Sequence, residues 1–575
     1  MLTTWDDAKE IWFVDFEYQP GTPTPRPWCL VARELRRGRV VRQWYGEFGA
    51  SPPYAIDRES VVIAYNTPAE WSCHLALGWP LPYNCVDLYT EFKALTNGKP
   101  HVQRHGLLDA LKYFSIRSID PSEKDEWRNL AMRGAPFTHN EKVGLLDYCQ
   151  TDVDALALLL PRMVPYFNFQ QAQLRERYTR AVALMNYYGV PLDMEAFTRV
   201  SEAWDDIRYR LIDEIDKHYG VYVDHKFKMK LFEQYIVRSG IPWARTEKGA
   251  LVTEKDLFRD MAKAYPQLAP LQELRASEGQ MRLKDLSVGS DGRNHADLWM
   301  FGAKTGRNKP SSTGFIFGHA TWMRSFIKAK PGWGIAYIDF SQQEFGIAAA
   351  LSGDMAMMDA YNSEDPYLAF GKQAGLIPPE GTKATHKFER GLCKQCVLAT
   401  QYGMGAESLA RRIDQDKAVA RALLRKHRET YATFWKWYQQ KVDRAILSQT
   451  IETCFGWRLH LGNDAKTTAI GNFPMQANGA EMLRLACCYL TEAGIRVCAP
   501  IHDAILLEAP SHLLDAHVAL AQELMAKASR DILHGFTVRT DAEIFAYSKR
   551  YQDERGVKMW NTVWKVLDDP RYYLE

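Results

Sequence analysis

The first part of the chain, to about residue 166, alternates between short apolar runs and amphipathic repeats. Ile11–Val14 and Val61–Ala64 are continuous apolar runs of strand length. Leu107–Tyr113 and Leu145–Leu160 repeat apolar residues at the spacing of one helix face. Strands that alternate with helices predict a compact α/β domain.

Farther along, the spacing becomes helical and then mixed. From about residue 170 to 300 the pattern predicts a helical arm, with long charged helices such as Gln171–Met185 and Glu202–His218. Strand-like runs return at Gly334–Asp339 and Val497–Ala509, on either side of a long helix-rich segment. We therefore expect an α+β domain whose strands are separated in sequence by a helical insertion.

Length and composition indicate a multidomain globular protein. At 575 residues the chain is too long for one hydrophobic core, and roughly three to five compact units are expected. The formal net charge of +2 does not indicate a polyanion as partner. The segment Lys383–Glu429, however, has eleven Lys and Arg residues against five Asp and Glu residues. A local basic surface of this kind suits phosphate.

The cysteines and the apolar runs indicate an intracellular protein. Ten cysteines follow no repeating spacing, no apolar run is long enough to cross a bilayer, and no signal-like segment opens the chain. Cys393 and Cys396 form the one CxxC motif, but it has no second pair or histidine at zinc spacing. We expect free thiols and a reducing, cytoplasmic environment.

Two acidic residues follow the first apolar run. Asp15 and Glu17 are two apart after Ile11–Val14, and the two-residue period of a strand points both carboxylates to one face. Carboxylate oxygens suit Mg²⁺ or Mn²⁺, which can stabilise both the attacking water and the leaving oxygen of a phosphodiester. An acidic pair at a strand end is more often part of a solvated turn, so this pair alone does not establish a nuclease metal site.

Two further pairs of polar residues follow. Asn66 ends the run Val61–Ala64 and is followed by Glu70. Tyr148 and Asp152 are four apart in an apolar helical stretch, which places them on one helix face. An exposed Tyr/Asp pair is the alternative interpretation of the last two residues.

In order and approximate spacing, these three pairs resemble the three motifs of the DnaQ-like proofreading exonucleases. The resemblance implies an RNase H-like fold and 3′-to-5′ exonuclease activity. It also implies a function for each residue: Tyr148 positions the water, and the ligands of two metals are Asp15, Glu17, Glu70 and Asp152. The second motif usually supplies aspartate, and Glu70 is one methylene longer.

A second pair of aspartates lies in the C-terminal part. Gly334–Asp339 ends in an acid and turns into a predicted helix that carries Glu344. Farther on, two apolar runs are joined by a tight turn at His502 and Asp503. Carboxylates on neighbouring strands could hold two metal ions about 4 Å apart, which suits the transfer of a nucleotide to a 3′-hydroxyl. Either aspartate alone is more often a turn residue.

A four-residue repeat between these runs places two cations on one helix face. The repeat consists of Arg390, Lys394, Leu398 and Tyr402. Arg390 can bind phosphate oxygens bidentately, Lys394 can neutralise charge that develops during transfer, and Tyr402 can stack on a base. A solvated basic helix face is the alternative.

Together these segments resemble motifs A, B and C of the family A DNA polymerases, the bacterial polymerase I and phage replicase type. Further matches are the family's TGR, SST, R-x-F and N-x3-Q elements at Thr305–Arg307, Ser311–Thr313, Arg324–Phe326 and Asn472–Gln476. The resemblance covers essentially the whole chain. It implies a right-hand polymerase of palm, thumb and fingers that adds dNMPs to a primer 3′-OH, with two Mg²⁺ ions per site and Mn²⁺ as the alternative ion.

The resemblance also assigns functions to single residues. Asp339 and Asp503 would hold both metals, and Lys394 would donate a proton to pyrophosphate. Glu344 would exclude a ribose 2′-hydroxyl, and Tyr402 would hold the template base in register. The implied nucleotide contacts are Phe340, Glu344, Arg390, Lys394, Leu398 and Tyr402. The implied DNA contacts are Arg307, Asn472, Gln476 and His502.

Two positions depart from the family pattern. Leu398 stands where motif B has an aromatic residue, and Ala504 stands where motif C has a glutamate. Because two aspartates suffice to hold the metals, we expect an active polymerase. Two alternatives stay open: an exonuclease whose polymerase half is a vestigial DNA-binding scaffold, and a non-enzymatic nucleic-acid-binding protein.

The expected partners are primer-template DNA and dNTPs, and a processivity factor is left open. We expect a monomer without a membrane segment, in the host cytoplasm if the chain is phage-encoded. On this interpretation the chain combines an exonuclease and a polymerase in 575 residues, and this compact organisation resembles that of phage replicases. The expected domains are an exonuclease over 1–166, a helical connector and thumb over 167–300, a palm over 301–354, fingers over 355–465 and a palm return over 466–575.

Overall fold

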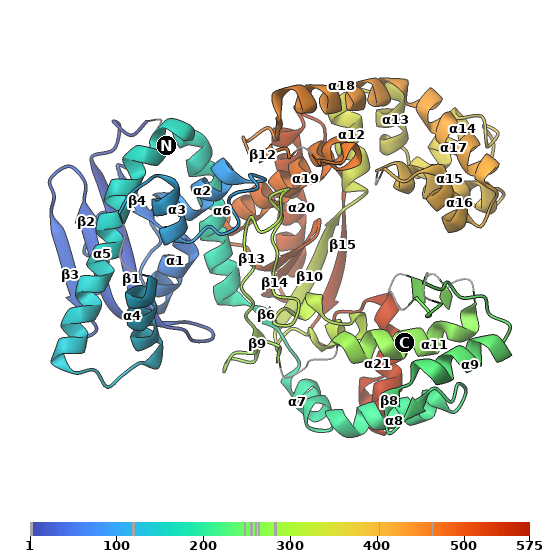
Figure 1. Ribbon diagram of the computed structural model, residues 1–575, viewed down its shortest axis with the longest axis horizontal. Coiled ribbons are helices and arrows are strands. Elements are labelled where there is room, and N and C mark those ends of the chain that lie inside the picture. The colour runs from blue at the N-terminus through green and yellow to red at the C-terminus, as the bar shows by residue number, and fades with distance from the viewer. Residues whose placement is uncertain are drawn as a thin grey trace.

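The computed structural model describes the chain in several ranges. These are residues 4–117, 121–246, 249–252, 257–258, 261–262, 265–280, 285–401, 403–462 and 464–574. Figure 1 shows a sheet domain at the N-terminal end, joined through helix α6 to a larger part that has a sheet at its centre. Two helical lobes lie toward opposite ends of the strands of that second sheet, one above and one below in this view.

The N-terminal sheet has five strands in the order β3-β2-β1-β4-β5. β1 pairs antiparallel with β2 and parallel with β4, while β3 and β5 form the edges. The predicted runs 11–14 and 61–64 are confirmed as parts of β1 and β4. The strands are β1 (Glu10–Gln19), β2 (Arg26–Glu34), β3 (Val40–Trp44), β4 (Ser60–Ala64) and β5 (Asn84–Asp87).

Helices cover both faces of this sheet. The longest, α5, begins with a capping box, in which Thr138 Oγ1 accepts from the Glu141 N–H at 3.2 Å and the Glu141 carboxylate accepts from the Thr138 N–H at 2.7 Å. α5 packs on β1 and β2, and α1 lies between the sheet and α6. The helices are α1 (Thr67–Ala76), α2 (Leu88–Thr96), α3 (Leu107–Tyr113), α4 (Pro121–Arg133) and α5 (His139–Met163).

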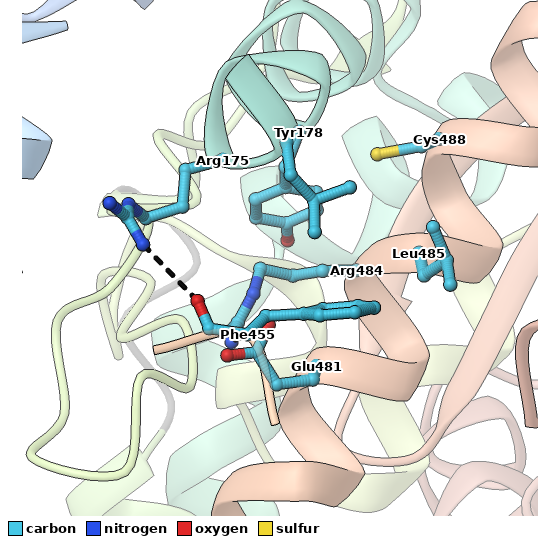
Figure 2. Close-up of a pocket in the computed structure, with 8 residues that line it drawn as sticks. Arg175, Tyr178, Phe455, Glu481, Arg484, Leu485 and Cys488 are labelled. Carbon is cyan, nitrogen blue, oxygen red and sulfur yellow. Dashed lines mark hydrogen bonds and ion pairs between the residues drawn. The ribbon is translucent and has the colours of Figure 1, made fainter. Parts of the chain in front are cut away.

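Helix α6 (Phe169–Tyr188) connects the two parts of the molecule. It packs on α1 and β5 on one side, and on α19 (Thr467–Glu492) and β13 (Arg496–Ile501) on the other. In the N-terminal half of α6, the Arg175 guanidinium forms a bidentate ion pair with Glu91 of α2, at 2.6 and 2.5 Å, and both side chains are buried. Arg175 also donates to the Phe455 carbonyl at 3.4 Å, which Figure 2 shows. Arg175 thus contacts both the N-terminal domain and the larger part.

The second sheet is antiparallel, in the order β13-β14-β10-β15. The predicted runs 334–339 and 497–509 are confirmed as β10, β13 and β14. α19 and α20 (Leu514–Ile532) pack against each other, and α20 contacts β10, β14 and β15. The three other strands are β14 (Ala504–Pro510), β10 (Trp333–Phe340) and β15 (Thr540–Ala546).

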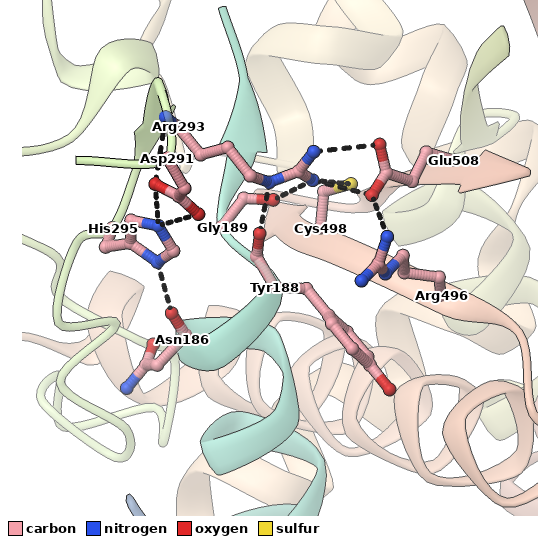
Figure 3. Close-up of polar contacts among 9 residues, drawn as sticks. All are labelled: Asn186, Tyr188, Gly189, Asp291, Arg293, His295, Arg496, Cys498 and Glu508. Atoms are coloured by element: carbon pink, nitrogen blue, oxygen red, sulfur yellow. Dashed lines mark hydrogen bonds and ion pairs between the residues drawn. The ribbon is translucent and has the colours of Figure 1, made fainter. Parts of the chain in front are cut away.

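A buried ion-pair cluster ties this sheet to the connection after α6. Glu508 on β14 pairs with Arg293 at 2.6 Å and with Arg496 at 3.1 Å, and its side chain is fully buried. Arg293 also donates to the backbone carbonyls of Tyr188 and Gly189, at 2.5 and 2.9 Å (Figure 3). A carboxylate without exposure is stable as an ion only when it is paired, so the cluster fixes β14 relative to the end of α6.

The upper lobe is the predicted helical insertion between β10 and β13. Its helices are α12 (Gln343–Ser352), α13 (Met355–Asn362), α14 (Pro366–Gln373), α15 (Lys387–Gln401), α16 (Ala406–Ile413), α17 (Lys417–Thr430) and α18 (Ala432–Ser448). The hairpin of β11 (Thr450–Glu452) and β12 (Arg458–His460) follows.

The lower lobe contains the predicted helical arm and also the end of the chain. Its helices include α7 (Met194–Glu202), α8 (Trp204–Asp216), α9 (Met229–Arg238), α11 (Ala269–Gln280) and α21 (Glu554–Val566). Small antiparallel pairs accompany them: β6 (Val190–Pro191) with β9 (Arg293–Asn294), and β7 (Tyr222–Val223) with β8 (Lys226–Phe227).

The position of α21 differs from the expected boundaries. The sequence interpretation assigned 466–575 to the sheet domain, but α21 packs on α8 and on the short helix η5 (Thr321–Phe326). The reason is that two buried tryptophans of α21, Trp560 and Trp564, complete the core of the lower lobe. No helix in the described ranges combines the length and the apolar composition needed to span a membrane.

Candidate active sites

Carboxylates of the N-terminal domain meet in one cavity of about 610 Å³. Asp15 and Glu17 lie on β1 and Asp152 lies on α5, and each offers an oxygen within 4.8 Å of the others. Glu70 of α1 and Tyr148 of α5 line the same cavity, although Glu70 lies outside the close group of three. The structure thus brings Asp15, Glu17 and Asp152 together, with Glu70 and Tyr148 in the lining of the same cavity. This arrangement arises because α5 crosses the strand that carries the first pair.

Burial raises the pKa of the carboxyl groups in this cluster. It raises the pKa of Asp15 to about 7, with the charge of Asp152 as the next cause. Burial, followed by the charge of Asp15, also raises the pKa of Glu17 and of Glu70. Asp15 Oδ2 and Glu70 Oε2 are buried and have no hydrogen-bond partner among the described residues. Unpartnered carboxylate oxygens in a polar cavity fit a hard divalent cation such as Mg²⁺ or Mn²⁺.

Lys124 of α4 belongs to this cavity, and sequence reasoning missed it. Its ammonium forms an ion pair with Asp152 Oδ2 and lies 5.3 Å from the centre of the Tyr148 ring. It acts against the rise in the pKa of Asp15 and of Glu17. Arg128, one helical turn further along α4, lines the same cavity. The four-residue spacing is visible in the sequence, but nothing local shows that α4 faces the carboxylates.

The second pair of aspartates meets at the end of the C-terminal sheet. Asp339 is the last residue but one of β10, and Asp503 lies in the turn between β13 and β14. The two carboxyl groups lie close enough for each to affect the pKa of the other, and the Phe340 N–H donates to the Asp503 carbonyl at 3.2 Å. Burial and then the charge of Asp503 raise the pKa of Asp339 to about 7. Their predicted proximity is confirmed, and Asp339 Oδ1 is buried without a partner in the described ranges.

The strand register places different residues on the two sides of Asp339. Ala504 of β14 is its direct partner on one side, and Asp541 of β15 is its direct partner on the other. Asp541 accepts a hydrogen bond from Ser341 Oγ, and its charge contributes to the raised pKa of Asp339. Asp541 was missed by sequence reasoning because the pairing of β15 with β10 has no local signal.

The Thr305–Arg307 turn lies beside this pair. Arg307 donates to Glu344 Oε1 at 3.0 Å, and its charge acts against the rise in the pKa of Asp503. The Gly306 carbonyl accepts from Arg484 of α19 at 2.6 Å, and Arg484 pairs with Glu481 at 2.9 Å. Figure 2 shows Arg484 and Glu481 packed below α6. The turn, α19 and α6 are therefore one connected unit.

Helix α15 carries the predicted stripe of cations. Arg390 Nε pairs with Asp365 Oδ2 at 2.5 Å, and Lys394 is exposed, with its ammonium 5.8 Å from the centre of the Tyr367 ring. Leu398 is half-buried on the same stripe. Tyr402 lies outside the described residues.

The four other predicted contact residues occupy different environments. Asn472 of α19 is mostly buried, with an unpartnered Oδ1 among the described atoms, and Gln476 is half-buried one turn later. His502 is exposed in the turn before Asp503. Phe340 is only 1% exposed and packs in the core, so its side chain offers almost no surface to a nucleotide. Successive side chains of a strand point to opposite faces of the sheet, so Phe340 faces away from the side that Asp339 occupies.

A family model for DNA polymerase family A matches residues 196–547, which is more than half of the chain. The chain belongs to DNA polymerase family A. The match includes Asp339, Asp503 and the whole upper lobe. Arg307, Glu344 and α15 therefore lie within the family A region. The carboxylates of the N-terminal cavity lie before it, whereas Trp299, which lines the same cavity, lies within it.

Several relatives of family A are similar to the chain over different lengths. DNA polymerase I of Aquifex aeolicus is 24% identical over 450 residues, which are 69% of this chain and 75% of the relative. The thermostable DNA polymerase I of Thermus thermophilus is 27% identical over 219 residues, which are 36% of this chain and 26% of the relative. The chain thus spans about a quarter of the length of that relative.

A solved structure has the same fold over nearly the whole chain. It is the POL domain of Pol1 from M. smegmatis in complex with DNA primer-template and dNTP, with a TM-score of 0.72 and 18% sequence identity. The superposition covers 94% of this chain and 96% of that one. The likeness therefore includes the N-terminal domain as well as the family A region.

Proposed function

We propose that the chain is a template-directed DNA polymerase that carries its own 3′-to-5′ exonuclease. The proposal for synthesis is carried by the neighbouring carboxyl groups of Asp339 and Asp503, which lie inside the family A region near the end of β10. The proposal for trimming is carried by the carboxylates of Asp15, Glu17 and Asp152 within 4.8 Å of one another. Two separate acidic sites support two separate activities.

At the first site, Asp339 and Asp503 would hold the metal ions, and the buried unpartnered oxygen of Asp339 supports this assignment. Bound magnesium would lower the pKa of a primer 3′-hydroxyl and stabilise charge on the transferred phosphate. Lys394 is exposed on α15 and is free to reach a triphosphate. Arg390 must exchange Asp365 for phosphate oxygens before it can bind the same group.

Glu344 and Arg307 support the assignment to DNA synthesis. Their ion pair holds the Glu344 carboxylate beside the catalytic aspartates, where it would meet the 2′-hydroxyl of a ribonucleotide. We therefore infer deoxynucleotides as substrates, with the sheet as palm, the upper lobe as fingers and the lower lobe as thumb. A replicative role of the phage type, action as a monomer and location in the cytoplasm rest on the resemblance of the motifs.

At the second site, Asp15, Glu17, Glu70 and Asp152 would hold the metal ions, and the two buried unpartnered oxygens fit that function. Tyr148 lies on the same helix as Asp152 and would orient the attacking water. Lys124 and Arg128 of α4 line the same cavity and would supply positive charge for the phosphates of a strand end.

Single substitutions test the two sites separately. We expect Asp339→Ala or Asp503→Ala to reduce primer extension at least a thousandfold and to leave degradation of a single-stranded end unchanged. Asp15→Ala should do the reverse. The measurement is a gel assay of a labelled primer-template with Mg²⁺, with and without dNTPs.

Two outcomes would contradict the proposal. Extension that is absent from the unmodified protein would favour the alternative of an exonuclease with a vestigial polymerase half. Loss of both activities in each variant would contradict two separate sites. Asp147→Ala is the matched control, because Asp147 is exposed on α5 and pairs with Arg42, outside the cavity.

A further inference from the structure

Asp339 has different chemistry on its two sides within the C-terminal sheet. Its direct partner on β14 is Ala504, and its direct partner on β15 is Asp541. Side chains at directly opposite positions of an antiparallel pair lie on the same face, with Cβ atoms about 5 Å apart. Ala504 offers no oxygen atom at this position, whereas Asp541 offers a carboxylate. Together with Asp503 in the neighbouring turn, three acids therefore lie near the end of β10.

Hydrogen bonds hold Asp541 in this position. Ser341 Oγ donates to Asp541 Oδ2, and the Ser341 N–H donates to the Arg539 carbonyl at 2.9 Å. The Ser341 carbonyl accepts from the hydroxyl of Tyr361, on α13 of the upper lobe, at 2.9 Å. The same Tyr361 oxygen accepts from the Arg539 N–H at 2.9 Å. Bonds from β15 and from the upper lobe thus fix Ser341, and Ser341 fixes the carboxylate of Asp541.

No cation neutralises Asp541 in the described part of the chain. Its side chain is exposed and belongs to no ion pair there. Arg539, on the same side of the sheet edge, instead donates to the backbone carbonyls of Tyr361 and Ser363, at 2.7 and 3.0 Å. Like charges at directly opposite positions destabilise a strand pair. The pairing of Asp339 with Asp541 is therefore unfavourable for the fold alone, and a bound cation would relieve the repulsion.

A second observation also indicates a cation at this place. Asp339 Oδ1 is buried and has no hydrogen-bond partner among the described atoms. Mg²⁺ and Mn²⁺ prefer carboxylate oxygens and carry the charge that a group of acids needs. Asp541 adds a third negative charge to this group without being buried with it.

We propose that Asp541 is a third acidic residue of the site for nucleotide transfer, a positioning residue whose charge raises the affinity of Asp339 and Asp503 for a divalent ion. Asp541 acts through Asp339, its direct neighbour across the strands, and through the attraction between its own charge and the ion. The inference rests on the proposed function in DNA synthesis, because it concerns the ions of that site.

The first test measures ion binding without catalysis. Free Mn²⁺ is measured by electron paramagnetic resonance in a mixture of the full chain, a fixed concentration of dNTP and a primer-template whose primer ends in a dideoxynucleotide. All proteins carry Asp15→Ala and Asp152→Ala, so that ions in the N-terminal cavity are not counted. Asp541→Asn keeps an oxygen that can accept from Ser341 but removes the charge, and should weaken Mn²⁺ binding about tenfold. Asp541→Glu keeps the charge and should stay within about threefold.

A residue on the same strand supplies the matched control. Glu543 is two residues farther along β15, on the same face and also exposed, but its direct partner is Tyr337 and not Asp339. Because the charge of Glu543 is farther away and screened by solvent, Glu543→Gln should change Mn²⁺ binding by less than about twofold. Equal weakening by Glu543→Gln and Asp541→Asn would overturn the assignment, and so would unchanged binding in Asp541→Asn.

Primer extension and thermal stability distinguish this function from a purely structural one. In Asp541→Asn the Mg²⁺ concentration for half-maximal extension should rise about tenfold, while kcat at saturating Mg²⁺ and KM for dNTP stay near those of the unmodified protein. The melting temperature in EDTA should not fall, because the lost charge repels that of Asp339. A lower melting temperature with an unchanged Mg²⁺ requirement would show that Asp541 is structural and would contradict the inference.

The outcome is separable from the proposed synthesis. If the unmodified protein does not extend a primer but its Mn²⁺ binding still depends on Asp541, the proposed synthesis fails and the assignment of Asp541 stands. If extension is normal and Mn²⁺ binding does not depend on Asp541, the assignment fails and the proposed synthesis stands.

Discussion

At the scale of single residues, the N-terminal domain contains a buried titratable group beside its acidic cavity. The Nδ1–H of His74 donates to the Pro80 carbonyl at 2.9 Å, so Nε2 of the neutral ring accepts from the Tyr54 hydroxyl. Burial lowers the pKa of His74 from 6.5 to about 4. The unfolded chain therefore binds a proton at higher pH than the folded chain does.

The sign of the pH dependence follows from this difference. Stability due to neutral His74 is complete above pH 6.5 and is lost as the pH falls through the window down to about pH 4. The loss amounts to about 3 kcal/mol. We predict that the free energy of opening of α1, measured by hydrogen exchange corrected for the intrinsic rate, falls over this window relative to that of His74→Gln, which does not titrate at this position. The carboxyl groups with raised pKa, Asp15 and Glu70, act in the opposite direction in both proteins, so the difference between the two curves isolates His74.

A control distinguishes this residue from general acid destabilisation. His139 is exposed at the start of α5, and His139→Gln should keep the pH dependence of the unmodified protein. The same slope in His74→Gln and the unmodified protein would contradict the explanation.

Residue-scale predictions from the sequence succeeded where the pattern was local. Asp15 and Glu17 could be paired because the period of a strand is two residues, and Asp339 could be placed because its apolar run ends there. Lys124 and Trp299 could not be found, since each reaches its partners only through tertiary packing. The burial of Phe340 was likewise missed, because a motif does not state which face of a strand a side chain occupies.

At the scale of elements, the contact between the two parts depends on a short loop after α2. The Asn97 carbonyl accepts from the His460 N–H of β12 at 2.9 Å, and the Asn97 side chain donates to the Arg458 carbonyl at 2.9 Å. Gly98 follows with φ of +87°, and a Cβ there would lie 2.3 Å from the His460 carbonyl oxygen. The backbones are too close for any side chain at this position.

A pair of glycine substitutions tests this docking. Gly98→Ala and Gly38→Ala both place alanine at positive φ, which costs about 1 kcal/mol, but Gly38 has open space around its Cβ position. We predict that Gly98→Ala costs about 2 kcal/mol more and separates the melting transition of the N-terminal domain in calorimetry. Matching calorimetric profiles for the two variants would mean that the loop does not hold the parts together.

Most elements near the sites could be predicted from periodicity alone. The runs at 11–14, 61–64 and 334–339 became strands because they are apolar, short and bounded by polar residues. The order of strands within each sheet could not be predicted, since pairing depends on contacts between distant residues. Asp541 shows the consequence, because it faces Asp339 only through the register of β15.

At the scale of the whole molecule, the end of the chain returns to the lobe where the family A region begins. Trp560 of α21 is fully buried, its ring lies 5.0 Å from that of Phe326, and its N–H donates to the Tyr572 carbonyl at 2.6 Å. Arg550, shortly before α21, pairs with Asp193, next to the start of α7, at 3.0 Å. The two ends of the region thus close on each other.

This closure predicts a global effect of one side chain. Trp560→Ala should cost about 3–5 kcal/mol, the usual cost of removing a buried tryptophan, and should lower the melting temperature of the lower lobe first. Differential scanning calorimetry and hydrogen exchange of residues 194–216 check this. Tyr573→Ala removes a ring that is 43% exposed, and should be nearly neutral. A neutral Trp560→Ala would show that α21 is dispensable.

The ion pair of Lys124 with Asp152 has a consequence for metal binding. The Lys124 ammonium already neutralises Asp152, so an incoming divalent ion has to displace a resident charge, whereas no lysine in the described ranges pairs with Asp339 or Asp503. If both proposed functions hold, occupancy of the N-terminal carboxylate cavity by a divalent ion should therefore decline first when free magnesium becomes scarce. DNA synthesis would then continue without removal of mismatched ends, and the mutation frequency of the synthesised strand would report the free magnesium concentration in the cell.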